Sequence, residues 1–368
     1  MTLADEIKII DTDTHVIEPA DLWTSRVATK WGDRIKMAWT SAFAGHDKFP
    51  PYFPRTLDEV DPATWDPKQR LQRMDERGIF AQVLYPNVAG FGAGQFLKAQ
   101  DPDLMYELVR AYNDFLVDFS STDSDRYIPV MAVPFWDVDL SVREIHRAAE
   151  IGHKGIVFGG YPEYFGEPDI TDRHWEPIWS TAEEMGLAIN FHVASGDTTN
   201  LFDGHLENGE HANFASNGVS YFLGNGRVIA KVICAGVCHR HPRLKFVSVE
   251  SGIGWLPYFC HALDWQWQQS GAHLEHPDYL LPSEYFKRQF YGCFWSEVET
   301  ALSAIELMGS SNFMFETDFP HPTSLEPGPA SIAPDPKTHI NEFFSRMKRR
   351  DAEAILHDNA AAVYGLTV

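Results

Sequence analysis

Short runs of β-branched and aromatic residues alternate along the chain with longer stretches in which apolar residues recur at helical spacing. Eight runs are predicted as strands: Ile7–Asp11, Phe80–Leu84, Tyr127–Ala132, Gly155–Phe158, Ala188–His192, Lys245–Val249, Phe290–Phe294 and Asn312–Glu316. The stretches predicted as helices are Asp103–Phe119, Leu140–Glu150, Trp175–Glu184, Val219–Cys238, Trp255–Ser270, Glu297–Leu307 and Pro336–Leu366. Every predicted strand except the first is followed closely by a helix. This order predicts an α/β fold of the (β/α)8 TIM-barrel type, because an open doubly wound sheet needs only about five to seven strands.

Two segments lie outside this alternation, and we interpret both as additions to a single barrel domain that covers residues 1–368. Residues 18–75, after the first strand, are rich in aromatic residues and proline but weak in periodicity. We predict a cap-like insertion over the barrel mouth, with a wrap against the outer helices as the alternative. Residues 195–217 are polar and rich in glycine and asparagine, and because they follow the fifth strand we predict an active-site loop.

The composition indicates a globular enzyme of the cytoplasm. The 368 residues include 30 Lys and Arg against 52 Asp and Glu, so the formal net charge is −22. Such a surface repels phosphate backbones and anionic lipids, which argues against nucleic acid and membrane partners. The opening MTLADEIKII has no basic region and no long apolar run, so secretion and membrane spanning are not expected. Four cysteines are too few for a disulfide framework.

Several common site patterns are absent or weak. The chain has no Gly-x-Gly-x-x-Gly after its first strand and no Gly-x-Ser-x-Gly, which argues against a dinucleotide site and a serine hydrolase. The segment CAGVCHRHP contains Cys234, Cys238, His239 and His241, a set that resembles a metal cluster by composition. Its two cysteines stand four residues apart on the predicted buried face of a helix, so we interpret this segment as structural.

Polar residues follow the predicted strands at the end where barrel enzymes build their active sites. They are Asp11, Asp13 and His15 after the first strand, Tyr85 and Asn87 after the second, His192 after the fifth, Glu250 after the sixth, Ser296 after the seventh, and Asp318 and His321 after the eighth. Divalent metals bind carboxylate oxygen and imidazole nitrogen, and residues two apart on an extended segment point the same way. We therefore predict a metal site from Asp13, His15, His192 and Asp318. Alternatively, His192 is a core residue and Asp318 caps a helix.

Four motifs make the sequence resemble the amidohydrolase superfamily, in its second amidohydrolase subgroup, which includes metal-dependent decarboxylases of aromatic and related acids. They are IDTDTHVIEP at Ile10–Pro19, NFHVASG around His192, RHPRLKFVSVESGIGWLP at Arg240–Pro257, and MFETDFPHP at Met314–Pro322. The resemblance implies a divalent ion held by Asp13, His15, His192 and Asp318. It also implies that Asp318 moves protons.

The sequence departs from the superfamily pattern at three places. Members commonly have His-x-His after the first strand, where this chain has Asp13, and many have a histidine after the sixth strand, where this chain has Glu250. The carbamylated lysine of the dinuclear hydrolases would follow the fourth strand, but Lys154 precedes it. The binuclear zinc pattern of the hydrolases is therefore not met.

These departures leave a carboxylate-rich set of candidate ligands. Such a set favours manganese or iron over zinc, with Glu250 as a candidate ligand of a second ion and Glu18 as a further candidate ligand. The alternative for Glu250 is that it binds the indole N–H of Trp255 or a neighbouring backbone group.

We hypothesise a metal-dependent enzyme that decarboxylates or hydrolyses a small organic acid. Its catalytic residues would be Asp318, His192 and His321. Asp318 would deliver a proton to the carbon that loses carbon dioxide, or take a proton from an attacking water, and His321 would orient the substrate. The aromatic insertion suggests an apolar or aromatic substrate.

Two other functions stay open. One is a dinuclear iron or manganese–iron monooxygenase on the same barrel, and the other is a structural subunit that has lost catalysis. We also expect a homo-oligomer or a hetero-oligomer with related barrels.

Overall fold

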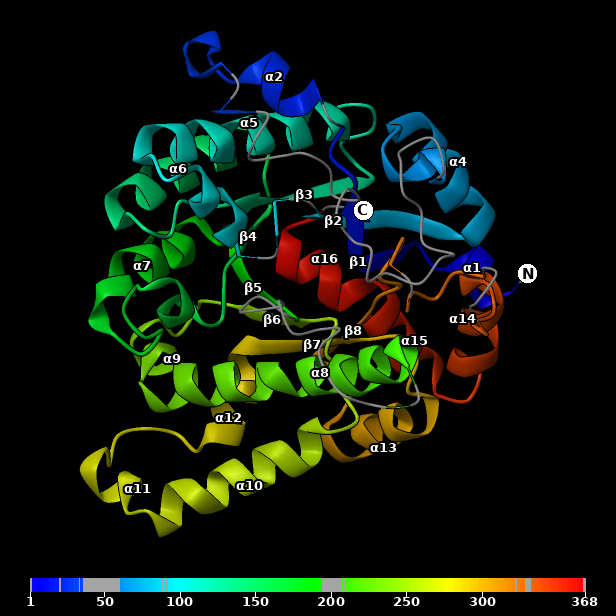
Figure 1. The fold of residues 1–368 in the computed structure, drawn as a ribbon. Helices are drawn as coiled ribbons and strands as arrows, with labels where there is room; N and C mark the ends of the chain where they lie inside the picture. Colours follow the sequence, from blue (N-terminus) through cyan, green and yellow to red (C-terminus); the bar gives the residue numbers. More distant parts are fainter. Residues whose placement is uncertain are drawn as a thin grey trace.

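Eight parallel strands form the centre of the molecule, with helices around them (Figure 1). The computed structural model describes residues 2–19, 21–32, 34–35, 60–87, 89–90, 92–193, 207, 209–321, 323–327 and 332–366. The strands are β1 (Ile9–Val16), β2 (Ile79–Pro86), β3 (Tyr127–Ala132), β4 (Gly155–Val157), β5 (Ala188–His192), β6 (Phe246–Val249), β7 (Phe290–Phe294) and β8 (Phe313–Phe315). They pair in sequence order, which confirms the predicted TIM barrel.

The barrel closes between β1 and the residues that follow β8. The His15 N–H donates to the Phe319 carbonyl at 2.7 Å, and the Asp318 N–H donates to the Asp13 carbonyl at 2.9 Å. The strand β1 runs on to Val16, so Asp13 and His15 lie within this strand and not after it, as the sequence had suggested. The seam that closes the barrel therefore carries predicted metal ligands on both sides.

The helices of the outer layer were mostly predicted. Those that match a predicted helix are α5 (Pro102–Ser120), α6 (Val138–Ile151), α7 (Glu176–Met185), α8 (Glu210–Cys234) with the short α9 (Val237–Arg240), α10 (Leu256–Gln269) and α13 (Val298–Met308). The predicted C-terminal helix is divided into α14 (Pro336–Phe344), α15 (Arg349–Glu353), a π-helical turn (Ala354–Asp358) and α16 (Asn359–Tyr364). Helices without a sequence prediction are α1 (Leu3–Glu6), α2 (Asp21–Arg26), α4 (Pro67–Arg77), α11 (Ala272–Glu275) and α12 (Pro282–Gln289).

Local sequence signals define α4. Asp66 accepts from the N–H groups of Lys68 at 2.8 Å and Gln69 at 3.1 Å, Pro67 occupies the first turn, and Gly78 ends the helix with a φ of 71°. These are the cap, first-turn and stop residues that a helix favours. Although α4 belongs to the predicted insertion 18–75, it packs against β2 in the outer layer.

Much of the two predicted additions lies outside the described residues. In the insertion these are residues 20, 33 and 36–59, and in the predicted loop they are residues 195–206 and 208. A cap over the mouth therefore stays a prediction. The end of the predicted loop is corrected, because residues 210–217 form the first turns of α8, which begins at Glu210 and not at Val219.

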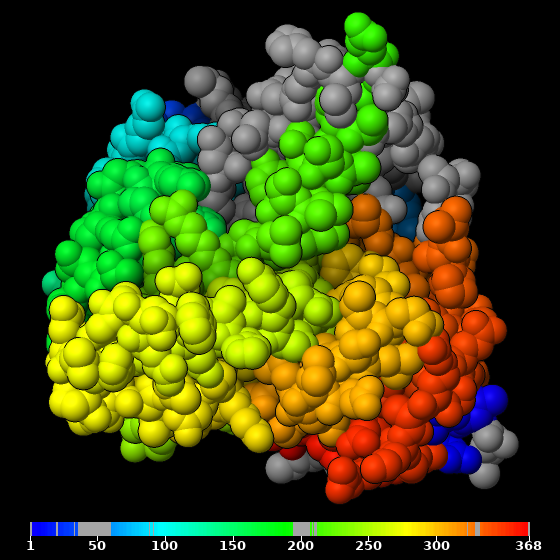
Figure 2. Space-filling view, turned by 90° about the horizontal axis from the view of Figure 1, so that it is seen from below, coloured from blue at the N-terminus to red at the C-terminus, as the bar shows by residue number. Residues whose placement is uncertain are grey.

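The surface seen in Figure 2 includes α10 and α11, drawn in yellow. The helix α10 exposes Tyr258 and Trp265. Among the described residues, no helix combines the length and apolar character needed to cross a membrane. The predicted oligomer stays a prediction.

Candidate metal centre

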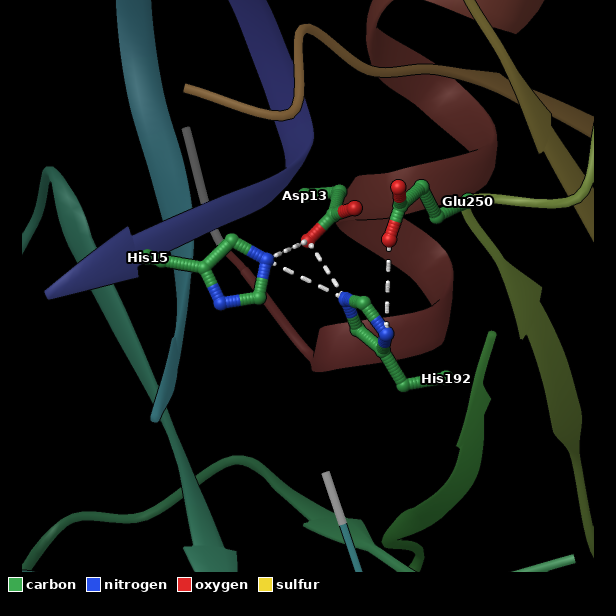
Figure 3. A group of neighbouring side chains, drawn as sticks. All are labelled: Asp13, His15, His192 and Glu250. Atoms are coloured by element: carbon green, nitrogen blue, oxygen red, sulfur yellow. Dashed lines mark hydrogen bonds and ion pairs between the residues drawn. The ribbon is translucent and has the colours of Figure 1, made fainter. Parts of the chain in front are cut away.

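Six side chains from four strands or the residues just after them meet at one end of the barrel. Asp13 and His15 come from β1, His192 is the last residue of β5, Glu250 follows β6, and Asp318 and His321 follow β8. They form two overlapping groups, within each of which the candidate ligand atoms lie within 4.8 Å of one another. The first group is Asp13, His15, His192 and Glu250, shown in Figure 3, and the second is His15, Glu250, Asp318 and His321.

Both histidines of the first group are oriented by backbone carbonyls. His15 Nδ1 lies 2.8 Å from the Pro86 carbonyl oxygen, and His192 Nδ1 lies 3.0 Å from that of Val193. A carbonyl only accepts hydrogen bonds, so each Nδ1 carries a proton and each Nε2 faces the cluster. The two Nε2 atoms are 3.2 Å apart, and two lone pairs at that distance repel unless a proton or a cation lies between them. This is how metal-binding histidines are fixed by groups behind them.

The carboxylate of Asp13 adds an anionic candidate ligand to the two histidine nitrogens of this group. Its Oδ1 lies 3.3 Å from His15 Nε2 and 3.4 Å from His192 Nε2. Within the part of the chain that the structure describes, neither oxygen of this fully buried carboxylate has a hydrogen-bond donor. A buried carboxylate without a donor is costly, and a bound cation removes that cost. The residues therefore fit a divalent metal ion.

The ionisation of the cluster follows from burial and close charges. Burial alone would raise the pKa of Asp13, but His192 and His15 hold that pKa well below its usual value. Burial alone would lower the pKa of His15, but Asp13 and Asp318 raise that pKa to about 10. Burial raises the pKa of Glu250 well above its usual value, and the nearby Asp318 and Asp13 raise it further. The close carboxyl groups thus favour a positive charge between them, which a protonated His15 or a bound cation would supply.

Asp318 and His321 form a hydrogen-bonded pair beside the first group. Asp318 Oδ1 lies 2.7 Å from His321 Nδ1, and His321 Nε2 lies 3.2 Å from the amide oxygen of Asn87. The amide oxygen only accepts, so His321 keeps a proton on Nε2 and the Nδ1–Oδ1 contact needs one more proton. The His321 ring stacks on that of His15 with centroids 3.9 Å apart. This pair can hold and move a proton next to the metal ligands.

Two residues of the cluster have left-handed backbone conformations. The φ angles are 53° at Glu250 and 60° at Asp318. Such angles are uncommon for residues other than glycine and persist only where surrounding contacts enforce them. Strain at both positions is typical of a functional site.

Other predicted residues lie elsewhere. Glu18 is buried but belongs to neither group, and its Oε1 accepts from the backbone N–H groups of Asn87 at 3.3 Å and Ala89 at 3.1 Å. Glu250 does not bind the indole N–H of Trp255, which was one of the two alternatives predicted for it. That N–H donates to the Ser251 carbonyl at 2.8 Å.

The CAGVCHRHP segment forms no group of candidate metal ligands among the described residues, as predicted, but its cysteines do not share one buried helix face, because Cys234 ends α8 and Cys238 lies in α9. Cys238 is buried, His239 Nδ1 lies 2.9 Å from the Tyr285 hydroxyl, and His241 Nε2 lies 3.0 Å from Glu176 Oε2.

Sequence reasoning did not single out Arg70 and Glu316, although both are buried beside the cluster. Glu316 stands two residues before Asp318, and strand alternation could have placed both on the barrel interior.

The family model for Amidohydrolase matches residues 10–366. A gamma-resorcylate decarboxylase from Polaromonas sp. (strain JS666 / ATCC BAA-500) is 24% identical over 298 residues, which cover 76% of this chain and 83% of that protein.

Two solved structures show the same fold. The amidohydrolase of Mycobacterium avium subsp. paratuberculosis K-10 superposes with a TM-score of 0.73 at 20% identity, covering 98% of this chain and 99% of that one. The 5-carboxyvanillate decarboxylase of Novosphingobium aromaticivorans DSM 12444, complexed with manganese and 4-hydroxy-3-methoxy-5-nitrobenzoic acid, gives a TM-score of 0.67 at 20% identity. That match covers 98% of this chain and 97% of the other.

Proposed function

We propose that this chain, which belongs to the amidohydrolase family, is a carboxy-lyase that uses a divalent metal ion to decarboxylate a small aromatic acid. The observation that carries the proposal is the pair of histidine Nε2 atoms, 3.2 Å apart, that face the Asp13 carboxylate. The decarboxylases among its relatives, one of them with bound manganese, support the reaction and the metal.

Asp13, His15, His192 and Asp318 would hold the ion, with Glu250 as a further ligand. The bound ion would supply positive charge for the substrate carboxylate and an adjacent oxygen. We expect manganese or iron before zinc, because three of the five ligand side chains are carboxylates. A second ion would share the Glu250 carboxylate, which belongs to both groups, whereas His15 Nε2 has a single lone pair and would bind only one ion.

The Asp318–His321 pair would supply the proton of the reaction. A proton passes from the Asp318 carboxyl to the ring carbon that carries the substrate carboxylate. The bond between that carbon and the carboxylate then breaks, its electron pair returns to the ring, and carbon dioxide leaves. His321, held by Asn87 at 3.2 Å and 21% exposed, would then take up from solvent the one proton that each turnover consumes and pass it to Asp318 at the 2.7 Å contact. Complete burial of Asp318 keeps water from competing for the proton.

The relatives do not favour the dinuclear oxygenase alternative, because the curated proteins that match are decarboxylases. Hydrolysis would release no carbon dioxide, so an assay of carbon dioxide release separates it from decarboxylation. No observation on the described residues favours a structural subunit, since the predicted ligands meet in one cluster.

The test is carbon dioxide release by the manganese-loaded protein from a panel of hydroxylated benzoic acids that includes 2,6-dihydroxybenzoate and 5-carboxyvanillate. We expect decarboxylation of at least one member and, in deuterium oxide, one deuterium at the vacated ring carbon. Loaded protein that releases no carbon dioxide but cleaves an ester or lactone of the same acids would overturn the decarboxylase proposal in favour of hydrolysis.

A further inference from the structure

The chain turns sharply just after β6, where Glu250 enters the metal cluster. Glu250 has a φ of 53° and Gly252 has a φ of 69°, so two left-handed residues stand within three positions. Glu250 Oε2 reaches to 3.6 Å from His192 Nδ1 (Figure 3). A non-glycine residue keeps such a conformation only when surrounding contacts enforce it. Two of the contacts that hold this turn come from other glutamates.

The first contact joins the residues after two strands that are not neighbours in the sheet. Glu316, directly after β8, is fully buried, and its Oε2 accepts a hydrogen bond from the Glu250 N–H at 3.1 Å. The strand β7 stands between β6 and β8, so this bond is not part of the sheet ladder. Glu316 Oε1 has no hydrogen-bond partner among the described residues. A buried carboxyl with an unsatisfied oxygen costs stability, which indicates a specific task for this side chain.

The second contact holds the rest of the turn. Glu297, just before α13, accepts a hydrogen bond at Oε1 from the Ile253 N–H at 2.5 Å. A Cβ on Gly252 would lie 2.4 Å from that same oxygen, and one on Gly254 would lie 2.4 Å from Thr300 Oγ1. Both positions therefore require glycine for close approach. This accounts for the sequence Glu-Ser-Gly-Ile-Gly, of which the metal cluster uses only the glutamate.

We propose that Glu316 and Glu297 are positioning residues that clamp the turn after β6 and so present the Glu250 carboxylate to the metal ion. The inference rests on the proposed metal site. Neither residue belongs to the two groups of candidate ligands, so each acts through Glu250. Loss of groups that orient metal ligands typically weakens metal binding about 10- to 100-fold.

The test measures the dissociation constant for Mn²⁺ by the electron paramagnetic resonance signal of the free ion. In Glu316→Leu the acceptor for the Glu250 N–H is lost, so we expect binding about 10- to 100-fold weaker than in the wild type. In Glu316→Gln an amide oxygen can take the place of Oε2, so we expect binding close to that of the wild type. Glu316→Leu with unchanged affinity, or Glu316→Gln as weak as Glu316→Leu, would overturn the role of Glu316.

A matched control separates positioning from general stability. Glu144 of α6 is also fully buried, and its Oε1 accepts from Asn113 Nδ2 at 2.7 Å, in a network with Arg147 outside the metal cluster. Glu144→Leu should lower the melting temperature and leave the Mn²⁺ affinity unchanged. If Glu144→Leu weakens Mn²⁺ binding as much as Glu316→Leu does, the effect is one of stability and the inference is wrong.

A second pair of variants tests the clamp without touching a buried charge. Gly252→Ala introduces the 2.4 Å contact with Glu297, whereas Gly186→Ala meets no atom within 4 Å at a nearly identical φ of 68°. We expect weaker Mn²⁺ binding only in Gly252→Ala, and equal affinities in the two variants would overturn the role of Glu297. If the wild type itself binds no Mn²⁺, the proposed function fails, which is distinct from these outcomes.

Discussion

The buried guanidinium of Arg70 offers a quantitative test of how β1 is held behind the metal cluster. Arg70 lies in α4 and is fully buried. Its Nε donates to the Ala63 carbonyl at 2.8 Å, its Nη1 donates to Thr14 Oγ1 at 3.2 Å, and its Nη2 donates to the His15 carbonyl. Burial lowers the pKa of Arg70 to about 10, so the group remains charged at neutral pH. Replacement by methionine keeps much of the volume and removes the donors of these three bonds and of a longer one from Nη1 to Gln82 Oε1 at 3.4 Å.

The expected loss of stability follows from the acceptors left behind. A buried polar group that loses its partner costs about 1–3 kcal/mol, so three acceptors set a range of about 3–9 kcal/mol. Two effects favour the lower end. Thr14 Oγ1 still donates to the Val83 carbonyl at 2.8 Å, and removal of the guanidinium also removes the cost of burying its charge. We therefore expect Arg70→Met to lower the free energy of unfolding by about 3 kcal/mol.

The assay is urea unfolding of Arg70→Met beside the wild type, with Arg350→Met as the control because the Arg350 side chain is 85% exposed. The control should stay within about 0.5 kcal/mol of the wild type. Because one of the lost bonds holds the His15 carbonyl, Arg70→Met should also bind Mn²⁺ more weakly. Equal stability of the two variants would refute the view that Arg70 holds β1 in place.

Three further outcomes are expected. Asp318→Asn should lower kcat by about 10²- to 10⁴-fold with an unchanged circular dichroism spectrum, and retained turnover would remove Asp318 from proton transfer. Glu250→Gln should hold less manganese than the wild type at the same free concentration by mass spectrometry of bound metal, and equal loading would exclude Glu250 as a ligand. Burial lowers the pKa of His153 to about 4 from 6.5, so the unfolded chain binds the proton more tightly and stability falls as the pH drops from 7 to 4. This histidine contributes about 3 kcal/mol of that fall. In urea unfolding, the free energy of unfolding of His153→Gln should therefore decrease less between pH 7 and pH 4 than that of the wild type. Equal decreases in the two proteins would contradict the assignment.

The strands were predictable because their buried residues form short apolar runs that local sequence alone reveals. Three of them, β3, β5 and β7, have the predicted bounds. The prediction missed α4 because it lies in a segment dominated by aromatic residues and proline, although Asp66 and Gly78 mark its two ends. The prediction also missed α12, whose eight residues run directly into β7.

The candidate ligands were predictable from their places relative to the strands, together with the family motifs. Their supports were not, because each support joins residues far apart in the sequence. Glu316 after β8 reaches Glu250 after β6 past the intervening β7, and Arg70 reaches His15 from an outer helix. No local pattern encodes such contacts, since they depend on how β1, β6 and β8 are placed in the closed barrel.

The most direct test of the metal-dependent site is the manganese content of the chain after loading and desalting, compared with that of His15→Ala and His239→Ala. His15 belongs to both groups of candidate ligands, whereas His239 bonds to Tyr285 away from them. We predict at least about one ion per chain in the wild type and in His239→Ala, and a large loss in His15→Ala. A wild-type chain without manganese, or equal content in all three proteins, would contradict the metal site on which the proposed function depends.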